Sequence, residues 1–461
     1  MKIKLAKFND FSKSILPIEA DLLKSHCKFE DDEKNTIFGI LLQNAATLEH
    51  NQSYSESIDK RKYSFLKLKC TQILEELDVD KILEKIQVWE QGIILDKIEK
   101  DQEKACLSLF KNSGSNHFHF LKLYELARVY RHYLLIRMKL NDYQLVNNYI
   151  TKFRSSYLRA TEINDKLNES TVEIVKHYIK NAETDKRWFE WLSEIFYDET
   201  LDGQSRVLAW IRLIFIAHNR KHYDMLTEHF HFFESKIKAG HFYSKRILTN
   251  FYSQYVLYHA HYKNFKQAIY YGYQSIKIIN NDSLYYINNL SAVLLRAKKA
   301  ATALDILKKA NSLAKNNSNE HSKIGHAAFT IFAYLELGQY KQAQNHAYIF
   351  YRAFRNEIVE HRWQLFFSAY FKALLINKEY LELIKIANSC HLIEKDKAFH
   401  GHSLYRPTIP WMIALAKYKT GMLSQSQLEI NIKTWNNNKS GFTNTNQIAD
   451  LNELTSKVMK A

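Results

Sequence analysis

The sequence predicts an all-α protein, and three observations support this fold class. Glycine and proline occur only 11 and 3 times in 461 residues, far below their usual shares of about 7% and 5%. Tight turns and β-sandwiches need these residues, so their scarcity favours helices joined by short loops. Aromatic residues make up 14% of the chain, enough to fill many contacts between helices. Finally, a similar short turn recurs along most of the chain.

Residues 1–115 lack this turn and are predicted to form an N-terminal helical domain. The segment FEDDEKNTIFGILLQNAATL starts with acidic residues, among them Asp31, and continues with an apolar face, as expected at the positive end of a helix dipole. SYSESIDKRKYSFLKLKCTQILEEL and VDKILEKIQVWEQGIILDKIEK indicate two more amphipathic helices. The polar stretch KNSGSNHFHF, around Gly114, is typical of a domain boundary.

The recurring turn is clearest in LELGQYKQA, from Leu335 to Ala343. In a pair of helices, a small residue can end the first helix, an aromatic can fill the turn, and alanine permits close contact between the helices. Gly338, Tyr340 and Ala343 supply these features in that order. Comparable turns end at Val146, Trp191, Leu226, Ala268, Ala303, Ala343, Leu383 and Ser426, at spacings of 35 to 45 residues.

This turn resembles that of the tetratricopeptide repeat (TPR), which reads G-x-Y-x-x-A. The best second helix is TALDILKKANSLAK, where Ala303, Leu307 and Ala310 stand at small, large and small core positions. In the first helix of the same unit, Leu290 and Ser291 fill the large and small positions. A spacing near 40 residues also fits HEAT-like helix pairs, which remain the alternative.

The resemblance covers roughly residues 116–435 and implies a right-handed α-solenoid of antiparallel, TPR-like helix pairs. Residues 436–461 are predicted to form a polar loop and a C-terminal capping helix. The resemblance also implies an inner groove, lined by first helices, that binds a partner segment. Its inward-facing positions fall on Arg128, Arg131, Lys176, Lys180, Arg212, Asn250 and Asn288. Solvated helix faces are the alternative explanation for these residues.

The charge of the chain is basic and unevenly distributed. Lys and Arg number 65 against 49 Asp and Glu, a formal charge of +16. Residues 1–115 carry 18 basic and 20 acidic residues, so the whole excess lies in residues 116–461. Such an excess favours an acidic partner segment, which the acidic helices of residues 1–115 could partly exclude. A compositional bias toward Lys and Asn is the competing explanation.

The sequence contains no familiar catalytic or cofactor motif. GxGxxG, GxxxxGK[ST] and HExxH are all missing. The clusters His218, His222, Asp224, His229 and His231, and His400 with His402, are interpreted as surface, groove or loop histidines rather than metal ligands. Asp78 and Asp80 lie between two expected helices, where helix capping is favoured over acid–base chemistry. We therefore expect no enzymatic activity, cofactor or metal.

The four cysteines, Cys27, Cys70, Cys106 and Cys390, form no CxxC motif, which favours a reducing compartment. The N-terminal residues MKIKLAKFNDFSKS lack the apolar core of a secretory signal, and no apolar run approaches the roughly 18 residues of a membrane span. A cytoplasmic protein without membrane contact is expected. The function predicted is a non-enzymatic scaffold or adaptor for a protein or peptide partner. The alternative is a nucleic-acid-binding regulator; YRHYLLIRMK (Tyr130–Lys139) interleaves aromatic and basic residues as such proteins do.

Overall fold

The structure is a computed structural model, and it describes residues 5–48, 52–176, 182–220, 223–398, 405–437 and 445–460. Helices account for most of these residues, and no β-strand occurs among them, which confirms the all-α prediction. The chain divides into two compact units, Met1–Phe251 and Tyr252–Ala461, called here the N-terminal and C-terminal units. Over the described ranges, no helix has both the length and the apolar content that a bilayer crossing requires.

The N-terminal unit begins with a run of helices, of which those over residues 32–46, 60–77 and 79–94 coincide with the predicted amphipathic segments. The run comprises α1 (Ala6–Ser14), α2 (Pro17–His26), α3 (Asp32–Ala46), α4 (Lys60–Leu77), α5 (Val79–Ile94) and α6 (Lys100–Asn112). Asp31 caps α3 because its carboxylate accepts the backbone N–H of Lys34 at 3.0 Å. Asp78 caps α5 in the same way, accepting the N–H of Asp80 at 2.8 Å. The predicted capping role of Asp78 is confirmed.

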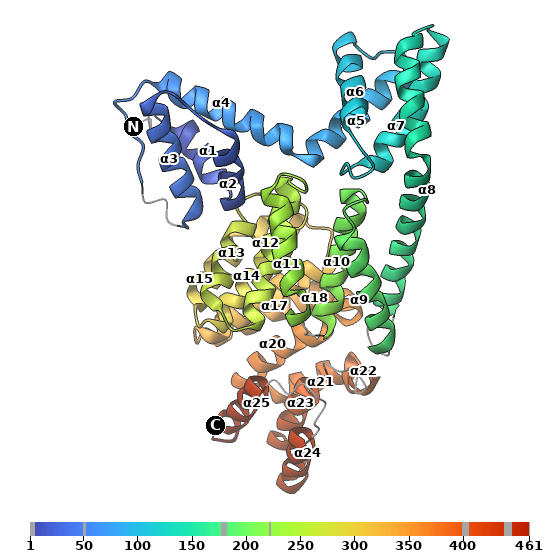
Figure 1. The fold of residues 1–461 in the computed structure, drawn as a ribbon. Coiled ribbons are helices and arrows are strands. Elements are labelled where there is room, and N and C mark those ends of the chain that lie inside the picture. Colours follow the sequence, from blue (N-terminus) through green and yellow to red (C-terminus); the bar gives the residue numbers. More distant parts are fainter. Residues whose placement is uncertain are drawn as a thin grey trace. The chain divides into compact units, whose positions relative to one another are not determined.

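A long helix organises the second part of this unit. The helices are α7 (Phe120–Ile136), α8 (Leu140–Lys176), α9 (Ala182–Tyr197), α10 (Gly203–Arg220), the 3-10 helix η1 (Tyr223–Leu226) and α11 (Thr227–Lys238), followed by the first part of α12 (Lys245–His261), which continues into the C-terminal unit. With 37 residues, α8 is about 56 Å long. In Figure 1, α7 lies beside its first half, and α9 and α10 lie beside its end. Both ends of α8 therefore contribute to packing.

Two expected turns of the N-terminal unit are not observed where they were predicted, and a third lies partly outside the described residues. The segment KRWFEW, residues 186–191, lies inside α9, so the turn predicted to end at Trp191 is wrong. The segment NDYQLV lies inside α8, and the chain turns earlier, at Met138, whose φ is +56°. Residues 221 and 222 of KHYDML lie outside the described residues, and Tyr223–Leu226 form η1. The repeat pattern is thus least regular in this unit.

The C-terminal unit is a succession of helix pairs. Its helices after α12 are α13 (Phe265–Ser275), α14 (Ser283–Arg296), α15 (Ala300–Lys309), α16 (Asn311–Asn316), α17 (Glu320–Glu336), α18 (Tyr340–Ala353), α19 (Arg355–Glu357), the π-helix η2 (Ile358–Arg362), α20 (Trp363–Ile376), α21 (Tyr380–Ser389), α22 (Leu392–Ala398), α23 (Thr408–Lys419), α24 (Gln425–Asn437) and α25 (Thr445–Lys460). The first helices pack in series, α14 on α17, α17 on α20 and α20 on α23. Each second helix also packs on the next first helix: α15 on α17, α18 on α20 and α21 on α23.

The same backbone turn ends the first helix of each pair. Its key residue has a positive φ: +58° at Lys263, +59° at Lys298, +71° at Gly338, +64° at Lys378 and +74° at Gly421. In every case this residue donates its N–H to the carbonyl three positions earlier, and the next residue donates to the carbonyl five positions before itself. This paired pattern is a helix C-cap in which a left-handed residue satisfies the last carbonyls. Lysine takes that conformation at a cost of about 1–2 kcal/mol that glycine avoids.

The turn in LELGQYKQA (Leu335–Ala343) agrees with the sequence prediction at two of its three key residues. Gly338 adopts the left-handed conformation, and Ala343 has no exposed surface. Tyr340 is 41% exposed, so its ring does not fill the turn as expected. Instead its backbone carbonyl accepts the side-chain N–H of Asn377 at 3.0 Å. The closure of this turn therefore depends on the backbone and on Ala343 more than on the tyrosine ring.

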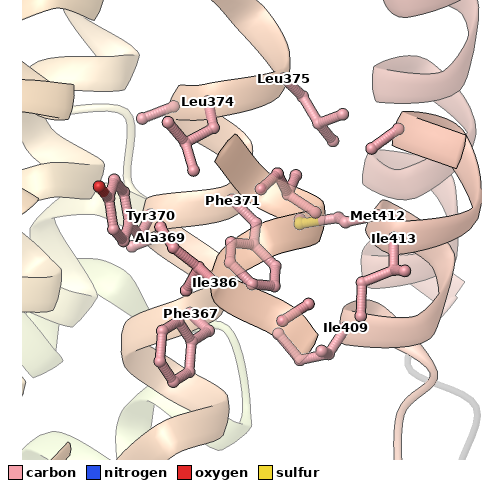
Figure 2. Packing of buried hydrophobic residues seen from close by; sticks show 14 of the residues in the cluster. Phe367, Ala369, Tyr370, Phe371, Leu374, Leu375, Ile386, Ile409, Met412 and Ile413 are labelled. Carbon is pink, nitrogen blue, oxygen red and sulfur yellow. The ribbon is translucent and has the colours of Figure 1, made fainter. Parts of the chain in front are cut away.

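Apolar side chains of the first helices form the core of the C-terminal unit. Figure 2 shows Phe367, Phe371 and Leu375 of α20 among Ile386 of α21 and Met412 of α23. Every one of these residues is at most 3% exposed. The predicted core residues Leu290, Ser291, Ala303, Leu307 and Ala310 are also buried. The expected second helix is interrupted at Ala310, which separates α15 from α16.

Candidate functional site

Three elements of the C-terminal unit meet at one glycine. Gly325 lies in the interior of α17, where glycine costs about 1 kcal/mol relative to alanine. A methyl group at this position would lie 2.6 Å from Nη1 of Arg362 and 2.9 Å from Nδ2 of Asn288. Neither approach leaves room for a Cβ. The glycine therefore allows Asn288 of α14 and Arg362 of η2 to reach the backbone of α17.

Asn288 fixes α14 against α17. Its side chain is 2% exposed, and Nδ2 donates to the carbonyl of Ser322 at 2.8 Å. Its Oδ1 is buried and accepts no hydrogen bond from the described residues. A buried acceptor without a donor is costly. The neighbouring Asn289 donates to Ser253 Oγ of α12 at 3.2 Å.

Arg362 brings a cation to the start of α20. It is the last residue of the π-helix η2, and such π-turns often occur at functional sites. Its Nη1 donates to the carbonyl of His321, at the start of α17, at 3.1 Å. The rings of His321 and His361 are 5.2 Å apart. Arg362 thus lies next to two imidazoles, from α17 and from η2.

Burial and neighbouring charges shift the pKa values of two groups near Arg362. Burial, then the charge of Arg362 and then His361, lower the pKa of His321. Burial of its hydroxyl end raises the pKa of Tyr285, although the residue as a whole is 37% exposed. The tyrosine therefore keeps its proton and can donate it. An incoming carboxylate or phosphate would raise the pKa of His321 again, because a negative charge favours the imidazolium.

This cluster lies at the start of α17, where His321 is exposed. Residues 324–328 of α17 are buried, and Glu336, 15 positions after His321 and about 22 Å along the helix, is exposed again. At the other end of α17, Glu336 forms ion pairs with Lys298, in the turn after α14, at 3.4 Å and with Lys372 of α20 at 3.7 Å. We call the cluster of Tyr285, Asn288, His321, His361 and Arg362 the Arg362 site.

The residues predicted to line a groove do not converge on one point. Arg128 on α7 is exposed, and Arg131 contacts Asn147 of α8 at 3.5 Å. Arg212 donates to the carbonyl of Leu167 of α8 at 2.8 Å, and burial lowers its pKa. Asn147 and Leu167 are 20 positions apart, about 30 Å along α8. Arg131 and Arg212 therefore contact different parts of α8.

The remaining predicted groove residues are placed as follows. Lys176 ends α8, and Lys180 lies outside the described residues. Asn250 is half-buried on α12. Among the predicted groove residues whose side chains the structure describes, only Asn288 takes part in the Arg362 site. Partner binding by this set stays a prediction.

The histidine cluster of residues 218–231 contributes to packing where it is described. His229 is buried, contacts Ser193 Oγ at 3.0 Å, and stacks on Phe196 with ring centroids 5.7 Å apart. His218 contacts the Tyr223 hydroxyl at 2.7 Å, and His231 is exposed. His222, His400 and His402 lie outside the described residues. Within the described ranges, no three His, Cys, Asp or Glu residues form a group suited to a metal ion.

Sequence reasoning missed His321, Gly325, His361 and Arg362. The one available signal was a glycine inside a helical pattern, which often marks close approach of another chain segment. Its partners Asn288 and Arg362 each lie 37 positions away along the chain. Comparison with family models, with curated proteins and with solved structures finds no significant match for this chain.

Proposed function

We propose that this protein is a non-enzymatic scaffold built on a TPR-like, right-handed array of helix pairs, and that it binds an acidic partner segment at the Arg362 site. The repeated backbone turn and the serial packing of α14, α17, α20 and α23 support the TPR-like assignment. A stack of this kind buries a continuous core and leaves a surface along its helices. Such surfaces commonly serve as binding sites for extended segments.

The observation that carries this proposal is the close approach permitted by Gly325. It places the Arg362 guanidinium beside two imidazoles and the Tyr285 hydroxyl. A guanidinium with neighbouring donors recognises carboxylate or phosphate oxygens well. Acidic side chains or a terminal carboxylate of the partner would bind at the Arg362 guanidinium.

Nucleic-acid binding is the second candidate function, and the formal charge of +16 favours it. The aromatic and basic segment Tyr130–Lys139 fits less well. Arg137 lies 3.7 Å from the centroid of the Tyr133 ring but is ion-paired to Asp96, and Lys139 is paired to Glu103 at 2.6 Å. A phosphate would have to displace both carboxylates. We therefore favour an acidic protein segment.

Site-specific photo-crosslinking tests the proposal. A benzophenone amino acid replaces Tyr285 in the full chain, and the matched control replaces Tyr348 of α18, which is 45% exposed. We expect crosslinks to an acidic segment from the native organism at position 285 and not at 348. Arg362→Gln should remove them, and lowering the pH from about 7.5 to 6 should increase them because His321 gains its proton. Equal yields at both positions, or captured nucleic acid, would refute the proposal.

A further inference from the structure

A second candidate binding surface lies in the N-terminal unit, between α1 and α4. A half-open groove of about 700 Å³ lies there. On α4 it is lined by a stripe at helical spacing: Lys60, Tyr63, Ser64, Lys67, Leu68 and Thr71. These positions span 11 residues, or three helical turns of about 16 Å in total. The opposite wall is formed by residues 5–8 at the start of α1.

The floor of the groove is apolar and rigid. Phe8 is 4% exposed and Tyr63 is 2% exposed, and their rings meet edge to face at 5.0 Å. The Tyr63 hydroxyl donates to the carbonyl of Ser55 at 2.8 Å, so its ring is fixed at both ends. Leu68, by contrast, is 70% exposed. A large apolar side chain open to water beside an apolar floor indicates a contact surface.

The rim of the groove is basic. Lys7, Lys60 and Lys67 line it, and none of the three forms an ion pair within the described parts of the chain. Lys67 lies 5.9 Å from the centroid of the Phe11 ring. The adjacent Lys62 differs, because it binds Asp31 at 2.8 Å and Glu33 at 2.6 Å. The unpaired lysines would be complemented by carboxylates on whatever covers the apolar floor.

We propose that this groove binds an acidic amphipathic helix of a partner protein. Its length of three turns, its apolar floor and its unpaired lysines match a helix with apolar residues at i, i+3, i+4 and i+7 and glutamates beside them. This groove lies on α1 and α4 only, so the proposal is independent of the Arg362 site.

Fluorescence anisotropy with a synthetic probe tests this inference on the full-length protein. The probe is a fluorescein-labelled helical peptide of about 15 residues, with leucines at the stated spacing and glutamates elsewhere. We expect saturable binding that weakens about fivefold or more when salt is raised from about 0.1 to 0.4 M. Leu68→Asp should weaken binding about tenfold. Because Leu68 is exposed, this loss of binding could not be attributed to misfolding of the variant. Lys60→Gln with Lys67→Gln should remove most of the salt dependence.

The controls separate this site from a general affinity for amphipathic peptides. Ile349→Asp on α18 replaces an equally exposed residue, at 67%, and should leave binding unchanged. A probe with lysines in place of glutamates should not bind. Vesicles of phosphatidylcholine and phosphatidylglycerol are the comparison for a lipid occupant. Absence of saturable binding, equal losses in the Leu68 and Ile349 variants, binding of the lysine probe, or preference for vesicles would each overturn the proposal.

Discussion

Replacing Gly325 with alanine tests whether the close approach at α17 is real. In an open helix the change would stabilise the fold by about 1 kcal/mol. Here the new methyl group lies 2.9 Å from Asn288 Nδ2 and 2.6 Å from Arg362 Nη1. The long arginine side chain can move at little cost, whereas the buried asparagine loses its hydrogen bond to the Ser322 carbonyl, which costs about 1–3 kcal/mol. Crowding adds about 1–3 kcal/mol. After subtraction of the gain in helix propensity, we expect a net destabilisation of about 1–5 kcal/mol.

The matched control is Gly39→Ala in α3. No atom lies within 4 Å of a Cβ added there, so this variant should gain up to about 1 kcal/mol. Because the two glycines lie in different units, hydrogen exchange of peptides from α3 and α17 is the suitable assay, since it reports each region separately. In an Asn288→Ala background the cost of Gly325→Ala should fall by about 1–2 kcal/mol. If Gly325→Ala stabilises α17 as Gly39→Ala stabilises α3, the contact is refuted.

The remaining predictions concern the turn, a helix cap and a buried histidine. Ala343→Leu should cost about 1–3 kcal/mol by overpacking, whereas Tyr340→Ala should cost less because the ring is 41% exposed; equal shifts in denaturant midpoint would contradict this. Asp78→Ala should cost about 0.5–2 kcal/mol, seen as faster hydrogen exchange at the start of α5. Burial, then His326, lowers the pKa of His346 to about 4. The unfolded chain therefore binds the proton first, so stability should fall as the pH drops from about 6.5 to 4, by up to about 3 kcal/mol. His346→Gln should flatten that part of the pH profile of thermal unfolding.

Local patterns carried the helical part of the prediction, and tertiary contacts limited it. Gly338 and Ala343 were identifiable because helix closure and helix contact depend on nearby residues. The segment KRWFEW has the residue pattern of the predicted turn but lies within the helix α9, which continues on both sides of it. Tyr340 occupies the position of a buried aromatic, but its exposure is decided by packing that no local pattern reports.

The Arg362 site shows the same limit more strongly. Asn288 was predicted from its position on a first helix, whereas Arg362 depends on the π-turn at Ile358–Arg362. One extra residue per turn rotates the start of α20, and no residue type in IVEHR requires that rotation. The meeting of α14, α17 and η2 at Gly325 depends on how three separate segments pack. A single helical glycine could suggest close approach but could not identify the partners.

The left-handed turn residues also bear on which sequences such a series of helix pairs can tolerate. Lys263, Lys298 and Lys378 hold the same backbone conformation as Gly338 and Gly421. The turn is thus maintained by its two backbone hydrogen bonds and by the packing that follows, at a tolerable cost of about 1–2 kcal/mol per lysine. Either glycine or lysine at this position is therefore compatible with the same turn between the paired helices. Replacing these three lysines with glycine would move the sequence toward a recognisable repeat motif and should raise stability rather than lower it.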